Sequence, residues 1–145
     1  MAITTAAMRD QIYSDLGGIM ASGSLALPVL YPDKGDQLPA TPQDLNAYKG
    51  RPFIIATILH QRSNQIAIGR PKKVRSDVEL HLEIATPSGN GMAQSDAISG
   101  ILRSGFTGLN SSDVRYRAPQ IKELDRNSLW QSTLVVIPFD FDEEL

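Results

Sequence analysis

Apolar and polar side chains alternate most regularly over residues 77–86. The even-numbered positions from 78 to 84 are apolar, and the odd-numbered positions between them are polar. Successive side chains of a β-strand point to opposite faces, so this period of two predicts a strand with one buried face and one mostly polar face. The apolar row is Val78, Leu80, Leu82 and Ile84, and the other row is Glu79, His81, Glu83 and Ala85.

Two stretches show helical spacing instead. Met8, Ile12 and Leu16 lie four residues apart and Ile19 follows, which predicts a helix over 3–16 that the following glycine pair at 17–18 ends. Residues 92–104 place apolar side chains on one helical face, with Asn90 as a possible N-cap and Gly105 as a possible C-cap. These apolar side chains are Ala97, Ile98, Ile101 and Leu102.

Two apolar segments near the middle of the chain predict further strands. Residues 25–31 form a short strand that Pro28 confines to an edge or a bulge. Residues 52–60 are typical of a buried strand because they are dense in β-branched and aromatic side chains. We expect a turn at 61–64 that leads into a second hairpin strand over 65–69.

The C-terminal third predicts two more strands. Residues 113–119 alternate, with Val114 and Tyr116 on the face opposite Arg115 and Arg117. Residues 129–139 form the last strand, and we expect the acidic residues after it to be a solvated tail. Residues 32–51 lack periodicity and form a loop of a length that is often functional or interface-forming.

The order of these elements favours one α+β domain over residues 1–145. Helix, strands, helix and strands follow one another, and the connections between neighbouring strands are too short for crossover helices. We therefore expect a mainly antiparallel, possibly mixed, sheet with two helices packed on one face.

Composition excludes several kinds of site and of binding partner. The chain has no cysteine, which excludes disulfides, thiolate metal sites and cysteine catalysis. The formal net charge is −2, so the whole molecule is not drawn to nucleic acid or to anionic membranes. The N-terminus lacks a signal-peptide pattern and the longest apolar stretches are too short for a membrane helix, which predicts a soluble protein.

A glycine-rich stretch at 84–106 is the first candidate for chemistry, because a strand, a Gly-Asn-Gly loop and a helix follow one another. A phosphate-binding P-loop needs Lys and then Ser or Thr after its second glycine, but Met92 and Ala93 stand there. The dinucleotide fingerprint needs a third glycine where Gln94 stands. A plain strand-to-helix turn is favoured over an anion site, and no cofactor is predicted.

The histidines and the acidic end do not form a catalytic or metal-binding set. His81 lies between Glu79 and Glu83, but residues two apart on a strand form a row and do not converge on one point. His60 lies at another strand position. A solvated or interface-facing surface is the favoured interpretation, and the chain is predicted not to be an enzyme.

Charged side chains supply the candidate interaction residues. A basic segment holds Arg62, Arg70, Lys72, Lys73 and Arg75, a hairpin that lacks the interleaved aromatic side chains that stack nucleic-acid bases. Pairing with an acidic partner, or a solubilising role, is favoured over nucleic-acid binding.

Two further rows of charge are complementary in sign. Arg115 and Arg117 form a basic row, and Glu79 and Glu83 form an acidic one. Such rows suit copies that meet around a ring, with the acidic row of one copy facing the basic row of the next. Pairing of the rows within one sheet, as cross-strand neighbours, remains an equal alternative.

A set of segments in a fixed order spans most of the chain: LPVLYPD, FIIATIL, VELHLEIATPSGNG, MAQSDAISGILRSGF, VRYRAPQI and the strand after Trp130. With these segments the chain resembles the tail terminator and tail-completion proteins of long-tailed bacteriophages, typified by the U-type terminator. The resemblance implies an α+β fold, no catalytic residues, and a location in the virion after assembly in the host cytoplasm.

The function that the resemblance implies is structural. Such a protein forms a ring, hexameric in this family, that caps the tail tube and joins it to the head connector or stopper protein. DNA only passes through the channel of the ring. A different neck subunit or a tail-tube subunit is the first alternative, and a small nucleotide- or nucleic-acid-binding module is the second.

Overall fold

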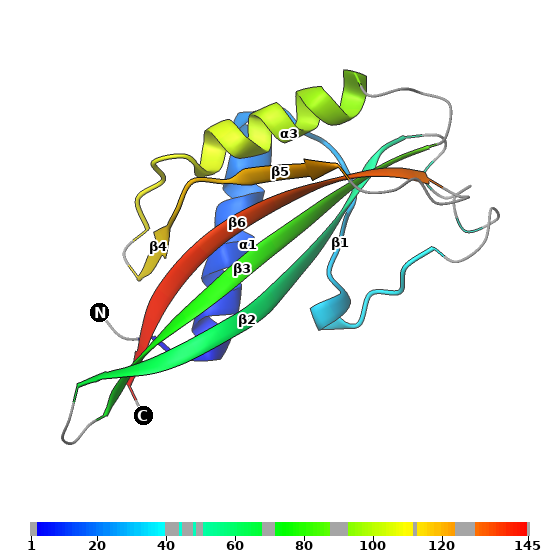
Figure 1. Ribbon diagram of the computed structural model, residues 1–145. Helices are drawn as coiled ribbons and strands as arrows, with labels where there is room; N and C mark the ends of the chain where they lie inside the picture. Colours follow the sequence, from blue (N-terminus) through cyan, green and yellow to red (C-terminus); the bar gives the residue numbers. More distant parts are fainter. Residues whose placement is uncertain are drawn as a thin grey trace.

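The fold is described from a computed structural model that covers residues 3–39, 44, 48, 51–67, 72–87, 93–111, 113–123 and 130–144. It contains two α-helices, a 3-10 turn and a six-stranded sheet, which confirms the predicted α+β class (Figure 1). In chain order the elements are α1 (Thr5–Ser22), β1 (Val29–Leu30), η1 (Pro32–Lys34), β2 (Phe53–Ala67), β3 (Lys73–Pro87), α3 (Ala93–Phe106), β4 (Val114–Tyr116), β5 (Gln120–Glu123) and β6 (Trp130–Glu144).

The sheet has the order β1-β2-β3-β6-β4, and β5 also pairs with β6 beyond the end of β4. Every pair of neighbours is antiparallel except β1 and β2, which run parallel. The short β1 covers only Ile54 and Ile55 of β2, so the strand predicted around Pro28 does lie at an edge.

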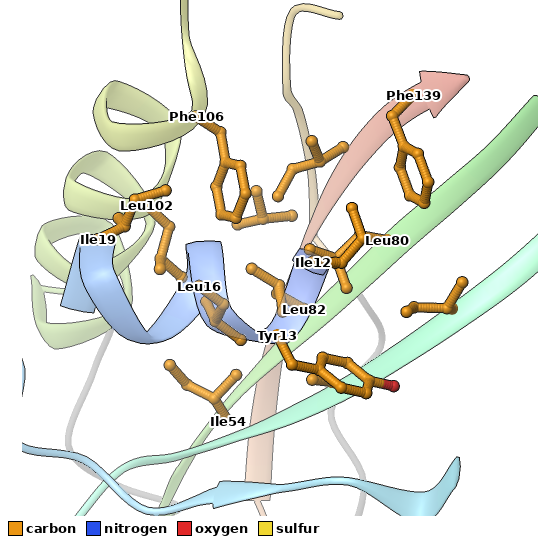
Figure 2. Packing of buried hydrophobic residues seen from close by; sticks show 14 of the residues in the cluster. Ile12, Tyr13, Leu16, Ile19, Ile54, Leu80, Leu82, Leu102, Phe106 and Phe139 are labelled. Carbon is orange, nitrogen blue, oxygen red and sulfur yellow. The ribbon is translucent and has the colours of Figure 1, made fainter. Parts of the chain in front are cut away.

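Both helices cover the same face of the sheet, as predicted, and the main core lies between them and the sheet (Figures 1 and 2). The predicted apolar row of β3 is buried in this core: Val78, Leu80, Leu82 and Ile84 are at most 1% exposed. Because opposite residues of antiparallel strands share a face, the inward side chains of β2 and β6 continue this row. A smaller cluster of Phe53, Ile55, Ala85 and Trp130 lies on the other face. We call that second face, which neither helix covers, the open face.

The prediction that the glycine pair at 17–18 ends the first helix was wrong. Helix α1 continues to Ser22, and Gly23 caps it by donating its N–H to the carbonyls of Ile19 and Ala21. Ile19 and Met20 are buried and extend the apolar face by another turn. Burial of these two side chains outweighs the cost of about 1 kcal/mol for each helical glycine.

The expected turn at 61–64 was also wrong. Strand β2 passes through these residues without a turn, and the hairpin partner is β3 rather than 65–69. The polar stretch resembled a turn because β2 leaves the core there: from Leu59 to Ile66 every side chain is exposed. This half of β2 and the facing start of β3 project beyond the helices (Figure 1). We call residues 59–67 and 72–75 the hairpin arm.

The acidic end is not a solvated tail. Strand β6 runs on to Glu144 and pairs with the start of β3, with Asp140 only 7% exposed. The two aspartates alternate with Phe139 and Phe141, which are buried in the core. The segment therefore has the period of a strand, with its acidic row on the open face.

Smaller corrections concern the remaining elements. The strand predicted over 113–119 is shorter, and after Pro119 the chain forms a separate strand, β5. Gly105 lies inside α3 rather than capping it. The possible N-cap Asn90, the Gly-Asn-Gly loop and most of the second half of the 32–51 loop lie outside the described residues.

Candidate functional site

Seven charged side chains form an unbroken chain of ion pairs on the open face of the sheet. Arginine and aspartate alternate along it, so each aspartate lies between two arginines. In spatial order the chain is Arg62, Asp77, Arg117, Asp140, Arg115, Asp142 and Arg75. We call these seven residues the ion-pair chain.

The strand register explains why these residues meet. Asp140 of β6 lies opposite both Asp77 of β3 and Arg115 of β4, and Arg62 of β2 lies opposite Asp77. Two carboxylates placed directly across from each other repel. Arg117 relieves this repulsion because its Nη2 lies 2.9 Å from Asp140 and 3.4 Å from Asp77.

Burial differs along the ion-pair chain. The Asp140 side chain is 10% exposed and bonds both Arg115 and Arg117. Asp142 receives a two-pronged contact from Arg75, with Nε and Nη2 at 2.8 and 3.1 Å from its two oxygens. Paired geometry of this kind is stronger than a single exposed ion pair. The ion-pair chain therefore fastens β4 and the base of the hairpin arm to β6.

The pKa values of two aspartates reflect this pairing. Hydrogen bonds from Arg75, followed by those from Arg115, lower the pKa of Asp142 to about 2 against the opposing effect of burial. A hydrogen bond from Arg62 is the main cause that lowers the pKa of Asp77. Both carboxyl groups are therefore charged at neutral pH.

Four of the predicted interaction residues, Arg62, Arg75, Arg115 and Arg117, belong to the ion-pair chain. Arg115 of β4 and Arg117, which follows β4, both bond aspartates of the same sheet. This arrangement favours the cross-strand alternative for the basic row over a contact between copies. Their partners are not the predicted ones, however, because Glu79 and Glu83 bond neither arginine.

Glu79 and Glu83 keep their predicted place on the open face of β3 and are partly exposed. Glu79 accepts hydrogen bonds from Gln61 at 3.2 Å and pairs with His81 at 3.1 Å. His60 is exposed at the start of the hairpin arm, where its ring lies 6.2 Å from that of Phe141. The two histidines are thus held apart on different strands.

The basic segment becomes the hairpin arm, and much of its charge is balanced locally. Arg62 pairs with Asp77, Arg75 pairs with Asp142, and Lys73 lies opposite Glu144 across the β3–β6 pair. Lys72 is exposed beside them, and Arg70 lies outside the described residues. Local balancing weakens the case for a nucleic-acid site because phosphate binding needs uncompensated cations.

A hollow of about 360 Å³ is lined by two arginines of the ion-pair chain, Arg62 and Arg117, together with Asp77 and Glu79. Arg62 uses its Nε for Asp77, while its side chain stays 73% exposed. Its remaining N–H donors can reach an acceptor on another molecule. The chemistry available here is recognition of a carboxylate or a backbone carbonyl.

Asp77, Asp140 and Asp142 are the site residues that sequence reasoning missed. The sequence does contain a strand pattern at this end, because Phe139, Asp140, Phe141 and Asp142 alternate between apolar and acidic side chains. Aspartate is uncommon inside strands, so this end of the chain resembled a tail. The arginine alternation on β4 was recognised, but the matching carboxylates lie more than twenty residues away in sequence.

The described residues contain no group of three or more His, Asp or Glu side chains that is arranged to hold a metal ion. The loop with Gly89 and Gly91 lies outside them, so the predicted strand-to-helix turn there stays a prediction. Among the described helices, none is both long and apolar enough to cross a membrane.

Comparison with known proteins informs the fold. No protein-family model matches the chain, and no curated protein matches it by sequence. Several solved structures match. One of them, whose name states no function, has a TM-score of 0.63 and 13% identity, and the match covers 97% of this chain and 96% of the other. At this identity the likeness establishes a shared fold over nearly the whole length of both chains.

Proposed function

We propose that the protein is a structural component of a long-tailed phage particle that forms a ring, hexameric in the family it resembles. The ring caps the tail tube and joins it to the head connector or stopper protein, with DNA passing through its channel. The resemblance described from the sequence is one support. The structural observation that carries the proposal is the hairpin arm.

The hairpin arm has the properties of an assembly element. Its β2 half is exposed over eight consecutive residues, including Leu59 at 41% and Ile66 at 43%. Where β2 and β3 leave the core, only the end of β6 pairs with them, so the hairpin arm gains little stability from apolar burial. Bracing by the ion-pair chain holds the hairpin arm in one direction, which lowers the entropy that docking costs.

The direction of the hairpin arm fits a ring that stacks on other rings. It continues the long strands β2 and β3 past the helices, and the C-terminal end of β6 accompanies it (Figure 1). If the strands run along the axis of the ring, the hairpin arm points toward the tail tube or the connector. A neck or tail-tube subunit would use such an element in the same way, and the particle experiment separates these roles.

The test is the location of the chain in particles. Phage particles produced from the genome that carries this gene are imaged, and the chain is fitted to the density. We expect one ring of copies at the joint between head and tail. Density for the chain that is repeated along the tube, or absent from the joint, contradicts the terminator role.

A gene deletion gives a second readout. Without the protein, we expect heads and tails that do not join, and joining restored when the gene is supplied in trans. As a control, a Leu38→Asp variant changes an exposed aliphatic residue outside the hairpin arm and should restore joining as well as the unaltered gene does.

A further inference from the structure

A hollow of about 780 Å³ lies between α1 and α3, which cross on one side of the sheet (Figure 1). Ile19 and Ile101 contribute apolar surface to it. Each helix also lines it with exposed residues four apart, which lie on the same side of a helix. These residues are Ser14, Gly18 and Ser22 of α1 and Asp96, Gly100 and Ser104 of α3. We call the space between these two rows the interhelix hollow.

Glycine at two of these positions is not required by packing within the chain. A Cβ atom added at Gly18 or Gly100 would have nothing within 4 Å. Gly23 and Gly105 differ, because each lies directly against an isoleucine of the other helix. Glycine inside a helix lowers the stability of the helix, and at positions 18 and 100 no contact within the chain offsets that cost. These two glycines keep the interhelix hollow open to the backbone of another molecule.

The charge that lines the interhelix hollow is negative. Asp15 and Asp96 lie there, and no Lys or Arg of the described residues does. Asp15 accepts hydrogen bonds from two uncharged donors, Gln11 and Tyr116. Asp96 is exposed, and its carboxylate has no ion pair in the part of the chain that the structure describes. A partner that carries a cation would therefore be attracted, and one that carries a carboxylate would be repelled.

We propose that the interhelix hollow docks a helix of a partner protein. The partner helix places short apolar side chains in the hollow and lysine or arginine beside Asp15 and Asp96. Apolar hollows recognise helices through residues three or four apart, and rows of short side chains let helices approach closely.

A second copy of this chain does not fit as a symmetric partner. Two copies that meet through the same surface would bring Asp15 and Asp96 of both copies together, and like charges repel. The inference goes beyond the proposed ring and does not depend on it, because the interhelix hollow lies on the helix side of the sheet and includes no residue of the hairpin arm.

The experiment uses the purified full chain and a synthetic helical peptide of alanine, leucine and lysine with capped ends and a fluorescent label. The control peptide has glutamate in place of every lysine. Fluorescence anisotropy measures the binding of both. We expect saturable binding of the lysine peptide with a Kd below about 1 mM, weakened by added salt because the charges are exposed. The glutamate peptide should bind much more weakly.

Filling the interhelix hollow should remove this binding. We expect Gly100→Leu to weaken binding of the lysine peptide about tenfold or more, because the added side chain occupies the space of the partner. Gly17→Leu is the matched control. An added Cβ at Gly17 also has nothing within 4 Å, but this residue does not line the hollow, so binding should equal that of the wild type. Circular dichroism verifies that both variants are folded.

Reversing the charge tests the chemistry of the partner. Asp96→Lys should weaken binding of the lysine peptide about threefold to tenfold, because a favourable exposed ion pair is replaced by a repulsive one. The same change should strengthen binding of the glutamate peptide. Asp10→Lys alters an exposed aspartate of α1 outside the hollow and should leave both affinities unchanged.

Three results overturn the proposal. The first is no binding of the lysine peptide at about 1 mM, and the second is binding that Gly100→Leu and Gly17→Leu affect equally. The third is a dimer of the wild type, seen by light scattering, that Gly100→Leu dissociates, since it assigns the interhelix hollow to a second copy. None of these results alters the particle imaging, which tests the proposed function separately.

Discussion

Gly105 of α3 lies directly against Ile19 of α1. A Cβ atom added at Gly105 would come within 2.3 Å of Ile19 Cγ2 and 3.2 Å of its Cβ. The reverse relationship exists one turn away, where Gly23 faces Ile101 at 2.4 Å. The crossing of the two helices over the sheet therefore depends on two glycines that each admit an isoleucine of the other helix.

The first prediction is that Gly105→Ala destabilises the protein by about 1 to 3 kcal/mol, the usual cost of overpacking. Ile19 is buried and β-branched, so it cannot turn away from the added methyl group. Gly100 of the same helix is the matched control because an added Cβ there has nothing within 4 Å. Gly100→Ala should stabilise by up to about 1 kcal/mol through helix propensity. Urea unfolding of both variants measures the difference, and equal shifts would contradict the packing role.

A second prediction concerns the centre of the ion-pair chain. Asp140→Asn should lower the free energy of unfolding by about 1.5 to 3 kcal/mol, the range for hydrogen bonds to charged groups. The reason is that Arg115 and Arg117 lose their shared, buried partner. Asp10→Asn removes the same charge at an exposed site on α1 and should change stability by less than about 0.5 kcal/mol. A loss no greater than that of the control would show that the ion-pair chain does not stabilise the sheet.

Acid should weaken the ion-pair chain in a defined window. The pKa of Asp142 is lowered to about 2 in the folded protein, whereas the pKa of an Asp in the unfolded chain is about 3.9. A lowered folded-state pKa contributes stability that is present above pH 4 and is lost as the pH falls toward 2. Urea midpoints should therefore differ between the wild type and Asp142→Asn at pH 5 and converge as the pH approaches 2. A gap that is constant with pH would rule out this linkage.

The hydroxyl of Tyr116 joins β4 to α1, because it donates a hydrogen bond to Asp15 at 2.5 Å. Tyr116→Phe should cost about 1.5 to 2 kcal/mol, the lower part of the range for bonds to a charged group, since Asp15 keeps a bond from Gln11 at 2.9 Å. Tyr31→Phe is the control, because its hydroxyl makes no hydrogen bond within the described residues. Thermal melting compares the two, and an equal effect of both changes would refute a specific role for the Asp15 bond.

Much of the candidate site was accessible from sequence, but its connections were not. The alternation at 113–117 placed Arg115 and Arg117 on one face, and the structure agrees. Their partners depend on which strand lies beside β4 and in which register, and no local pattern contains that information. The acidic end was misjudged for the same reason. Its aspartates form ion pairs only because the fold brings Arg75 of β3, Arg115 of β4 and Arg117, which follows β4, beside them.

Local patterns along the chain predict the fold class, the buried row of β3, the apolar faces of both helices and the position of β1 at an edge. These features follow from local periodicity, because a side chain that must leave water imposes the period of its element on the chain. Contacts in the folded protein decide where α1 ends, how β2 continues into the hairpin arm and how the ion-pair chain forms. Each of these depends on contacts between residues that are distant in sequence, where packing and register outweigh the preference of any single residue.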